Sequence, residues 1–425
     1  MGKIFRKPEN IIIVGGGVAG LMIARELSAK GFIVTILEVD NRLGGRVHTI
    51  RGLSFSQPVE KGVEFIHGNL PITIQLLKEA GIEYTPVGGE MGRIENGEWK
   101  TQEDFAIDWY EIMKKMNEVR DDLTMDEFLE KNFSDKRYED VKKSILRFAE
   151  GFDVADTSKA SVLALREEWM GEEDKQYRIP GGYDQLTNYL KKQCLECGCI
   201  IHTSSLVYEI QWEPNNVTVK TKTQVYYSNK VIVTVSLGAL LNNRINFQPA
   251  IPLYMNAAER IGFGTVVKVM LEFKDPFWVK KKRNPGFFFS DEIIPTWWTQ
   301  APSSYPLLTG WAGGPQAWPL QGKDDQSILE LALSSLSNIF KKSVDELKVL
   351  LSASLVANWK KDPFAAGAYS YSFVNSVTAQ KLFRTPIHNT LFFAGEAYYD
   401  GPSPGTVEAA LTNGRDVART ILEGS

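Results

Sequence analysis

The sequence predicts an α/β protein in which a nucleotide-binding domain is interleaved with a second, α+β domain. The 425 residues are enough for two domains. A strand–turn–helix–strand pattern opens the chain at residues 11–38, and a strand–loop–helix pattern closes it at residues 391–422. No low-complexity linker separates the segments between them, so we expect two domains that share the chain in alternating pieces.

The composition is typical of a globular enzyme and argues against two classes of partner. Hydrophobic residues make up 43% of the chain and charged residues 24%. The net charge of -4 argues against nucleic acid, which calls for a concentrated basic face. No stretch reaches the roughly 18 consecutive apolar residues of a membrane span. We therefore expect a cytoplasmic protein with no nucleic-acid or membrane partner, while the sequence leaves the oligomeric state open.

Three cysteines, Cys194, Cys197 and Cys199, lie within six residues. An odd number in a long chain argues against a disulfide framework and for a reducing compartment. Their spacing would suit a metal, but no second Cys/His cluster lies near them in the sequence. We predict structural cysteines and no metal site.

The opening segment is a predicted dinucleotide site. Ile11–Val14 is a β-branched run typical of a parallel strand buried on both faces. The glycines that follow fit G-x-G-x-x-G, which permits a tight turn, close approach of a diphosphate and close helix–strand packing. The diphosphate would lie at the N-terminus of a helix that ends at Lys30-Gly31. The predicted contacts are Gly15, Gly17, Val18, Ala19 and Gly20.

A second strand is predicted at Phe32–Leu37, and Glu38 follows it directly. Glu38 lies 18 residues after Gly20. This is close to the spacing of the acid that binds the adenosine ribose in Rossmann-like domains. The pattern predicts a Rossmann-like dinucleotide-binding domain, and at this point both NAD and FAD remain open.

The segment after Glu38 favours FAD. Arg42, Gly44, Gly45 and Arg46 form an R-x-G-G-R element that resembles the FAD-binding amine oxidases and their relatives. Arg46 would supply a fixed, bidentate positive charge for the diphosphate or the flavin. The resemblance implies an FAD domain of the amine oxidase/glutathione reductase type.

The C-terminal stretch LFFAGEAYYDGPSPGTVEAALTNGRDVARTIL resembles the second FAD fingerprint of the flavin-containing amine oxidases. That family includes monoamine oxidases, polyamine oxidases and related histone demethylases, and the motif pattern is most similar to polyamine oxidase-like bacterial members. We expect a strand at Leu391–Phe393 and a helix from near Thr406, whose N-terminus would face an anion or the flavin. The further cofactor contacts implied by the resemblance are Gly395, Glu396, Thr406, Val407 and, at the adenine, Val207.

The resemblance extends over nearly the whole chain and implies its division. The FAD-binding domain would comprise residues 8–80, 181–269 and 388–425, and the substrate-binding domain residues 81–180 and 270–387. The first substrate segment reads as charged and helical, including 104–133. The second reads as strand-like and rich in tryptophan. A hairpin turn is expected at 213–216.

Four residues are candidates for chemistry at the flavin: Lys268, Trp359, Tyr369 and His67. Alternation places Lys268 on the same face as Val266 and Met270, which favours a buried lysine. The resemblance implies that Lys268 holds a water near flavin N5. Trp359 and Tyr369 match aromatic positions of the family, and Tyr369 would form one wall of an aromatic cage.

Departures from the family refine these expectations. Ala368 stands where monoamine oxidases carry the cysteine that bonds to the flavin, so FAD is expected to be non-covalent. Thr406 replaces the second cage tyrosine of monoamine oxidases, so the pocket should be more open. Asp40 stands where the family usually has an arginine near the ribose, which puts one adenosine contact in doubt.

Residues 60–68, EKGVEFIHG, resemble a strand beside the flavin, with Glu64 and Phe65 as backbone contacts. Amino-acid oxidases carry a substrate-clamping arginine in this stretch, and none is present between Arg51 and Arg93. This counts against an amino-acid substrate. His67 is either a satisfied histidine at a strand end or a pocket residue that hydrogen-bonds the amine or its water.

Together these features predict an FAD-dependent amine oxidase that acts on a primary or secondary amine, mono- or polyamine. Hydride would pass to flavin N5 and O2 would be reduced to hydrogen peroxide, so the expected partners are a small amine and O2. The alternatives are a porphyrinogen oxidase or carotenoid-type desaturase, and a non-catalytic flavoprotein scaffold. Acidic residues at 167–168 and 172–174 would attract a polycation or form a solvated loop.

Overall fold

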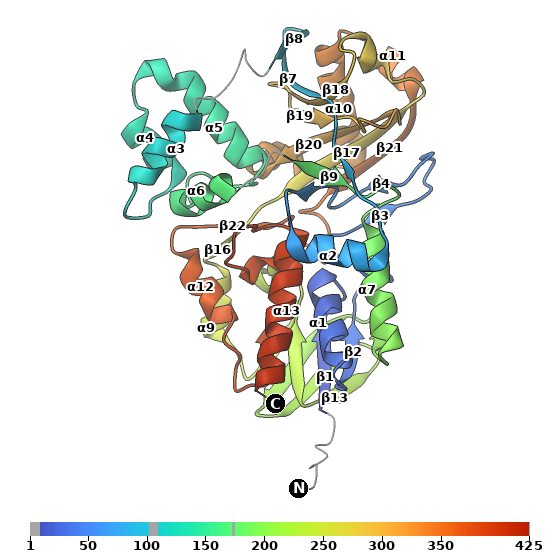
Figure 1. The fold of residues 1–425 in the computed structure, drawn as a ribbon, viewed down its shortest axis with the longest axis vertical. Helices are drawn as coiled ribbons and strands as arrows, with labels where there is room; N and C mark the ends of the chain where they lie inside the picture. The colour runs from blue at the N-terminus through green and yellow to red at the C-terminus, as the bar shows by residue number, and fades with distance from the viewer. Residues whose placement is uncertain (1–8, 102–108, 172–174, 425) are drawn as a thin grey trace.

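The computed structural model describes residues 9–101, 109–171 and 175–424. Its lower half in Figure 1 is built on a five-stranded sheet of order β10-β2-β1-β14-β23, in which every neighbouring pair is parallel. The strands come from widely separated parts of the chain: β1 (Asn10–Val14), β2 (Ile33–Leu37), β10 (Ile200–His202), β14 (Lys230–Val233) and β23 (Leu391–Phe393). This confirms the predicted Rossmann-like α/β fold.

Both faces of this sheet are covered, so every residue of the apolar run in β1 is buried on one face or the other. Ile11 and Ile13 belong to the core beneath the helices, whereas Ile12 and Val14 belong to the core on the opposite face. The helices are α1 (Val18–Ser28), α2 (Pro71–Ala80), α7 (Asp184–Glu196) and α13 (Val407–Glu423), with α13, α1 and α7 side by side in Figure 1. The predicted end of α1 at Lys30 was two residues late, because the helix ends at Ser28 and Gly31 adopts a φ of +88° in the turn.

A four-stranded sheet of order β13-β12-β11-β15 covers the opposite face. Its strands are β11 (Val207–Glu213), β12 (Asn216–Thr221), β13 (Val225–Ser228) and β15 (Asn246–Gln248), and the β11–β12 turn falls where the sequence predicted it. Two short helices flank β15: α8 (Leu237–Leu241) precedes it and α9 (Pro252–Ala258) follows it.

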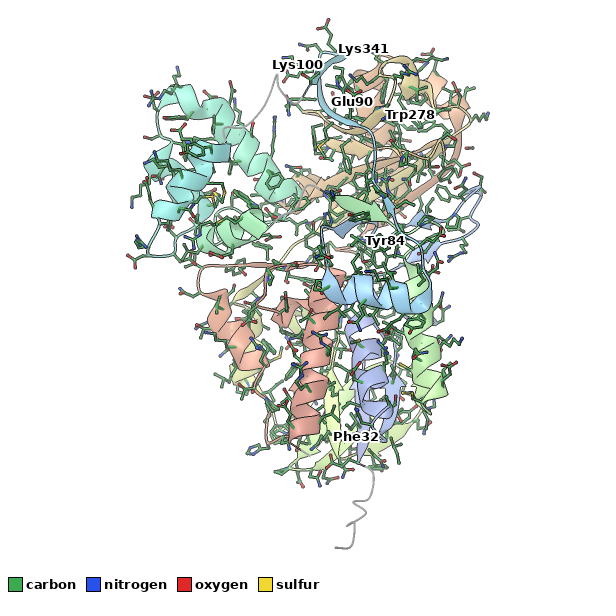
Figure 2. All side chains as sticks on the ribbon, in the orientation of Figure 1. Phe32, Tyr84, Glu90, Lys100, Trp278 and Lys341 are labelled. Atoms are coloured by element: carbon green, nitrogen blue, oxygen red, sulfur yellow. The ribbon has the colours of Figure 1, made fainter. Side chains whose placement is uncertain are left out.

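The upper right of Figure 1 holds a seven-stranded sheet of order β21-β17-β20-β19-β18-β7-β8. The strands are β7 (Glu90–Glu95), β8 (Glu98–Thr101), β17 (Val266–Phe273), β18 (Pro285–Phe289), β19 (Thr296–Trp298), β20 (Leu307–Gly313) and β21 (Leu351–Asn358). Side chains fill the space between this sheet and its helices, where the buried Trp278 lies (Figure 2). The predicted domain boundary at 269 falls inside β17, and the domain ranges as a whole stay a prediction.

The strand-like prediction for residues 270–387 was incomplete. This segment also forms α10 (Asp325–Phe340), α11 (Val344–Leu350) and α12 (Ser376–Phe383). Ile328, Ala332 and Leu336 recur every four residues and bury one face of α10 against the sheet, which is a helical and not a strand period.

A group of helices lies at the upper left of Figure 1: α3 (Trp109–Glu118), α4 (Met125–Asn132), α5 (Glu139–Gly151) and α6 (Val162–Gly171). The predicted helical stretch 104–133 is divided between α3 and α4, and its residues 104–108 lie outside the described residues. Thr124 begins α4 with a reciprocal capping box to Glu127, which explains the division. Trp311 of β20 donates to the Gly151 carbonyl at 2.7 Å and joins α5 to the sheet.

The prediction of one strand over residues 60–68 was wrong. Glu60 ends the short strand β4 (Val59–Glu60), and only Ile66–His67 form β5. Between them the backbone follows the R-x-G-G-R segment irregularly, with Val63 N donating to Arg46 O at 3.3 Å. A Cβ at Gly62 would lie 1.8 Å from that same carbonyl, so the approach is too close for a regular ladder.

The remaining elements are short. They are β3 (Thr49–Ile50), β6 (Thr85–Pro86), β9 (Gln176–Arg178), β16 (Ile261–Phe263) and β22 (Ser370–Ser372), and the 3₁₀ turns η2 (Lys136–Tyr138), η3 (Phe277–Lys280), η4 (Gly314–Leu320) and η5 (Glu396–Tyr398). Among the described residues, none of the helices combines the length and the apolar character needed to cross a membrane.

Candidate active site

One cavity of about 890 Å³ runs from the N-terminus of α1 to the seven-stranded sheet. Its walls come from both ends of the chain and from the segments around β5, β17 and β21. Every residue predicted for the site lines this cavity except Gly20. The structure therefore brings together residues that the sequence separates by several hundred positions.

The three fingerprint glycines have three different surroundings. Gly15 has a φ of +115°, and a Cβ there would lie 2.6 Å from Thr234 Oγ1. A Cβ at Gly20 would lie 2.2 Å from the Gly15 carbonyl oxygen, so Gly20 allows helix and strand to pack closely. At Gly17, by contrast, no atom lies within 4 Å of a Cβ position. Gly17 thus leaves open space at the helix N-terminus, as a bound diphosphate requires.

Glu38 is buried at the end of β2, beside this space. Its carboxylate accepts from the backbone N–H groups of Gly16 at 2.5 Å and Asp40 at 2.9 Å. Burial raises the pKa of Glu38, and these two hydrogen bonds oppose the rise. Val207, the predicted adenine contact, lines the same end of the cavity.

The two arginines of R-x-G-G-R have different partners. Arg42 donates to the carbonyls of Gly45 at 2.7 Å and Val47 at 3.1 Å, so its guanidinium braces its own loop. Arg46 Nη1 donates to the Glu396 carboxylate and to the Ala368 carbonyl, each at 2.6 Å. Arg46 therefore joins the N-terminal fingerprint to the C-terminal one, a contact that the sequence does not reveal.

Helix α13 directs its N-terminus at the cavity. Thr406 is its N-cap, and the hydroxyl accepts from Ala409 N at 3.1 Å. Glu408 turns the other way and accepts from Ile72 N at 2.9 Å and Thr73 N at 2.8 Å. It thereby caps α2, whose own N-cap residue, Leu70, has no polar side chain. Sequence reasoning missed this role of Glu408.

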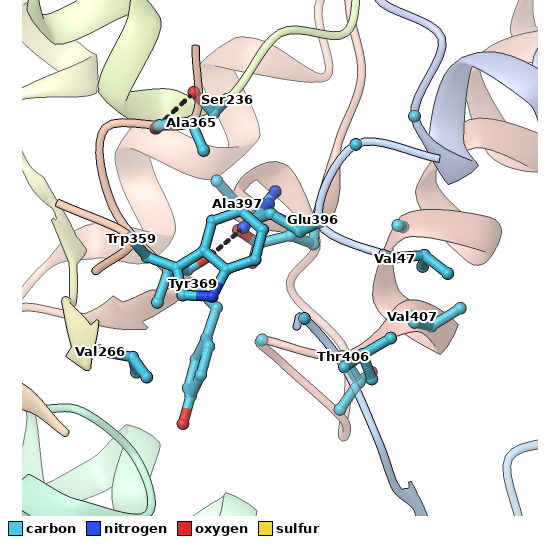
Figure 3. Close-up of a pocket in the computed structure, with 18 of the residues that line it drawn as sticks. Val47, Ser236, Val266, Trp359, Ala365, Tyr369, Glu396, Ala397, Thr406 and Val407 are labelled. Atoms are coloured by element: carbon cyan, nitrogen blue, oxygen red, sulfur yellow. Dashed lines mark hydrogen bonds and ion pairs between the residues drawn. The ribbon is translucent and has the colours of Figure 1, made fainter. Parts of the chain in front are cut away.

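Trp359 and Tyr369 form one side of the cavity, with Thr406 and Val407 on the other (Figure 3). Trp359 is fixed by an Nε1 hydrogen bond to the Lys61 carbonyl at 3.2 Å. The Tyr369 hydroxyl donates to the Phe152 carbonyl at 2.5 Å, at the end of α5. Burial, with contributions from nearby acids, raises the pKa of Tyr369 well above its ordinary value, so the phenol is neutral.

Lys268 is 1% exposed, in agreement with the strand alternation. Its Nζ donates to the Gly62 carbonyl at 3.1 Å and to Glu64 Oε2 at 2.9 Å. The other carboxylate oxygen, Oε1, accepts from Arg178 Nε at 3.0 Å and Trp298 Nε1 at 2.9 Å. Burial raises the pKa of Glu64, but the Lys268 and Arg178 cations outweigh it and hold that pKa at about 2. The sequence predicted only backbone contacts for Glu64, and it gave no local signal for Arg178 or Trp298.

His67 lines the cavity between aromatic rings. Its ring centroid lies 5.5 Å from that of Phe152 and 6.1 Å from that of Phe65. Its buried Nδ1 has no hydrogen-bond partner within the described residues. Burial lowers the pKa of His67 to about 4, so the imidazole is neutral at ordinary pH.

The far end of the cavity is aromatic with a charged margin. The aromatic residues lining it are Phe148, Phe152, Phe287, Phe289, Trp298 and Trp311. Arg93 and Arg147 also line it and both pair with Asp291. Neither arginine was predicted from the sequence to line the cavity. Glu168 lines the cavity as well, whereas the acids at 172–174 lie outside the described residues.

Two helix N-termini of a Rossmann-like domain meet at one cavity, and a lysine lies among aromatic side chains further along that cavity. This combination defines a flavin-binding oxidoreductase. Residues 18–422 match the family model described as flavin containing amine oxidoreductase, so the chain belongs to that family. The residues present fit its cofactor, FAD, because the open space at Gly17 and the buried Glu38 suit a diphosphate and a ribose. The FAD is non-covalent, and none of the three cysteines lines the cavity.

Two curated relatives cover almost the whole chain. The sequence is 26% identical to "Polyamine oxidase 4" of Oryza sativa subsp. japonica, over 96% of this chain and 87% of the relative. It is also 26% identical to "Lysine-specific histone demethylase 2" of Homo sapiens, over 96% of this chain and 52% of that longer protein.

Solved structures show the same fold. A putrescine oxidase bound to putrescine superposes with a TM-score of 0.82 at 18% identity, covering 98% of this chain and 99% of the other. Cyclohexylamine oxidase from Brevibacterium oxydans IH-35A superposes with a TM-score of 0.81 at 20% identity, with the same coverage.

Proposed function

We propose that this protein is an FAD-dependent oxidase of a primary or secondary amine, either a monoamine or a polyamine. The observation that carries the proposal is one continuous cavity. It extends from the predicted dinucleotide site at Gly15 and Gly17, past the buried Lys268, to the aromatic residues at its far end. When bound, FAD supplies the acceptor for the hydride of the amine α-carbon and the site at which O2 is reduced to hydrogen peroxide.

The chain's own residues then have to bind and orient a neutral amine. An ammonium has no lone pair to stabilise the developing iminium, so the amine must lose its proton before reaction. Tyr369 and Trp359 offer aromatic surface, and the neutral His67 and Tyr369 place no charge against the amine. Lys268 has one N–H left after its two hydrogen bonds, and we assign that N–H to an ordered water beside the flavin.

The names of the relatives support an amine substrate: polyamine oxidases, a histone lysine demethylase, a putrescine oxidase and a cyclohexylamine oxidase. They favour this reading over a porphyrinogen oxidase, a carotenoid-type desaturase or a non-catalytic scaffold. The three free cysteines support a cytoplasmic location.

The test is anaerobic mixing of the FAD-loaded protein with monoamines, diamines, polyamines, amino acids and methylated lysine peptides. We expect bleaching of the flavin absorbance by at least one amine, with a rate that rises with pH through an amine-like pKa. Mixing with O2 should then restore the absorbance with release of hydrogen peroxide. Absence of bleaching by every amine would reject the proposal and favour a desaturase or a scaffold.

A further inference from the structure

We propose that Arg178, Glu64 and Lys268 form a positioning triad that holds one net positive charge at the flavin end of the cavity and so raises the reduction potential of the bound flavin. This inference depends on FAD binding and not on the identity of the amine. Lys268 and Glu64 line the cavity and Arg178 does not, so Arg178 acts through Glu64 and Lys268.

The triad fixes the direction of the lysine. The ammonium group of Lys268 has three N–H donors. Two of them bond Gly62 and Glu64, so one N–H remains. Glu64 cannot turn away, because Oε1 accepts from Arg178, Trp298 and Gln300 at 2.9–3.2 Å. The remaining N–H of Lys268 therefore has a single direction.

Arg178 is fixed in turn by the backbone. It donates to the carbonyls of Thr299 at 2.8 Å and Ala301 at 3.2 Å, and its guanidinium lies 4.7 Å from the centre of the Phe65 ring. The chain Thr299–Arg178–Glu64–Lys268 thus links the residue that follows β19 to the first half of β17 through charged hydrogen bonds.

The three groups do not neutralise each other. Two cations share one carboxylate, which leaves one positive charge among side chains that are 1%, 7% and 12% exposed. A charge in so buried a place acts on its neighbours with little screening by water. A flavin gains electrons on reduction, so a nearby positive charge stabilises its reduced form.

Glu60 is a second buried acid whose pKa the Lys268 cation lowers. It accepts from Tyr183 N at 2.6 Å and from Thr49 Oγ1 at 3.0 Å, and it makes no hydrogen bond to the lysine. Burial raises the pKa of Glu60 to about 7. The charge of the triad is therefore best measured at pH 6, where Glu60 is mostly protonated.

The experiment measures the midpoint potential of bound FAD at pH 6 by reductive titration against a reference dye. Glu64→Gln keeps the side-chain shape and removes the negative charge, so the potential should rise. Arg178→Gln removes one positive charge, so the potential should fall. The double variant E64Q/R178Q restores one net charge and should return toward the wild-type potential, although both native contacts are lost.

The matched control is Arg25→Gln, which removes a cation from the Arg25–Glu79 pair outside the cavity and should leave the potential unchanged. Shifts of the same sign in E64Q and R178Q, or no shift, would show that the triad is only structural. Should E64Q fail to fold, R178Q decides alone: an unchanged or higher potential overturns the proposal. No amine is used, so a protein that oxidises no amine can still confirm or reject the triad.

Discussion

Arg46 Nη1 lies 2.6 Å from both Glu396 Oε1 and the Ala368 carbonyl oxygen. In the sequence, Glu396 is 350 positions from Arg46 and Ala368 is 322 positions from it. Glu396 also accepts from the Ser370 hydroxyl at 2.6 Å. Arg46 and Glu396 thus hold the two fingerprints together at the cavity.

We predict that Arg46→Met lowers both the stability of the apoprotein and its FAD content. The buried Glu396 carboxylate would lose its charged partner, at a cost of about 2 kcal/mol after allowance for the partial exposure of Arg46. Thermal unfolding of the apoprotein and the ratio of flavin to protein absorbance measure the two effects. In R46M/E396Q the stability loss should be smaller than the sum of the single losses; strict additivity would mean that the pair is not coupled.

The fingerprint glycines offer a contrast between fold and ligand. Gly20→Ala places a Cβ against the Gly15 carbonyl and should destabilise the apoprotein by roughly 1–3 kcal/mol. At Gly17 there is space for a Cβ, and the backbone is extended, with φ of -72° and ψ of -178°. The Gly17→Ala apoprotein should therefore keep the wild-type unfolding temperature. Its methyl group would instead intrude on the diphosphate and weaken FAD binding. Equal apoprotein stabilities for the two variants would contradict this assignment.

Tyr369→Phe tests whether the phenol has any role in proton transfer. Removing its hydroxyl leaves the Phe152 carbonyl without a partner, which should cost about 1 kcal/mol of stability. Because burial keeps the Tyr369 pKa above its usual range, the phenol stays neutral, and the pH profile of flavin reduction should be unchanged apart from its height. A lost or shifted limb in that profile would assign the phenol an acid–base role.

His67 should make the protein less stable in mild acid. The folded-state pKa is about 4, below the ordinary 6.5, so the contribution to stability is complete above pH 6.5 and is lost as the pH falls toward 4. Relative to His67→Gln, the wild type should lose roughly 2 kcal/mol of unfolding free energy between pH 7.5 and pH 5. Urea unfolding of both proteins across this range measures the difference, and parallel pH curves would place His67 in contact with water.

Glu60 should show the opposite dependence. Its folded-state pKa is raised to about 7, so its contribution is complete below the unfolded value of 4.5 and is lost as the pH rises through 7. Relative to Glu60→Gln, the wild type should therefore become less stable from pH 4.5 to pH 7.5. The same urea series measures this, and a difference that does not vary with pH would mean that folding leaves the pKa of Glu60 at its ordinary value.

Local patterns were predictable from the sequence where the physical cause is local. The turn at Gly15, the helix after it and the strand that leads to Glu38 depend on residues a few positions apart, and all three are found. The N-cap at Thr406 was predictable for the same reason. Helix α10 was missed although its apolar period is local, because its segment was interpreted from its tryptophan-rich strands alone.

The sequence by itself determined the class of this protein: a Rossmann-like FAD domain of the amine oxidase type and a buried lysine on a strand. Only the tertiary structure decided what surrounds that lysine. Glu64 lies 204 residues from Lys268, 114 from Arg178 and 234 from Trp298, and no periodicity links such distant positions. Their meeting depends on how two sheets pack around one cavity, where buried charges must find partners, and that requirement acts on the folded chain as a whole.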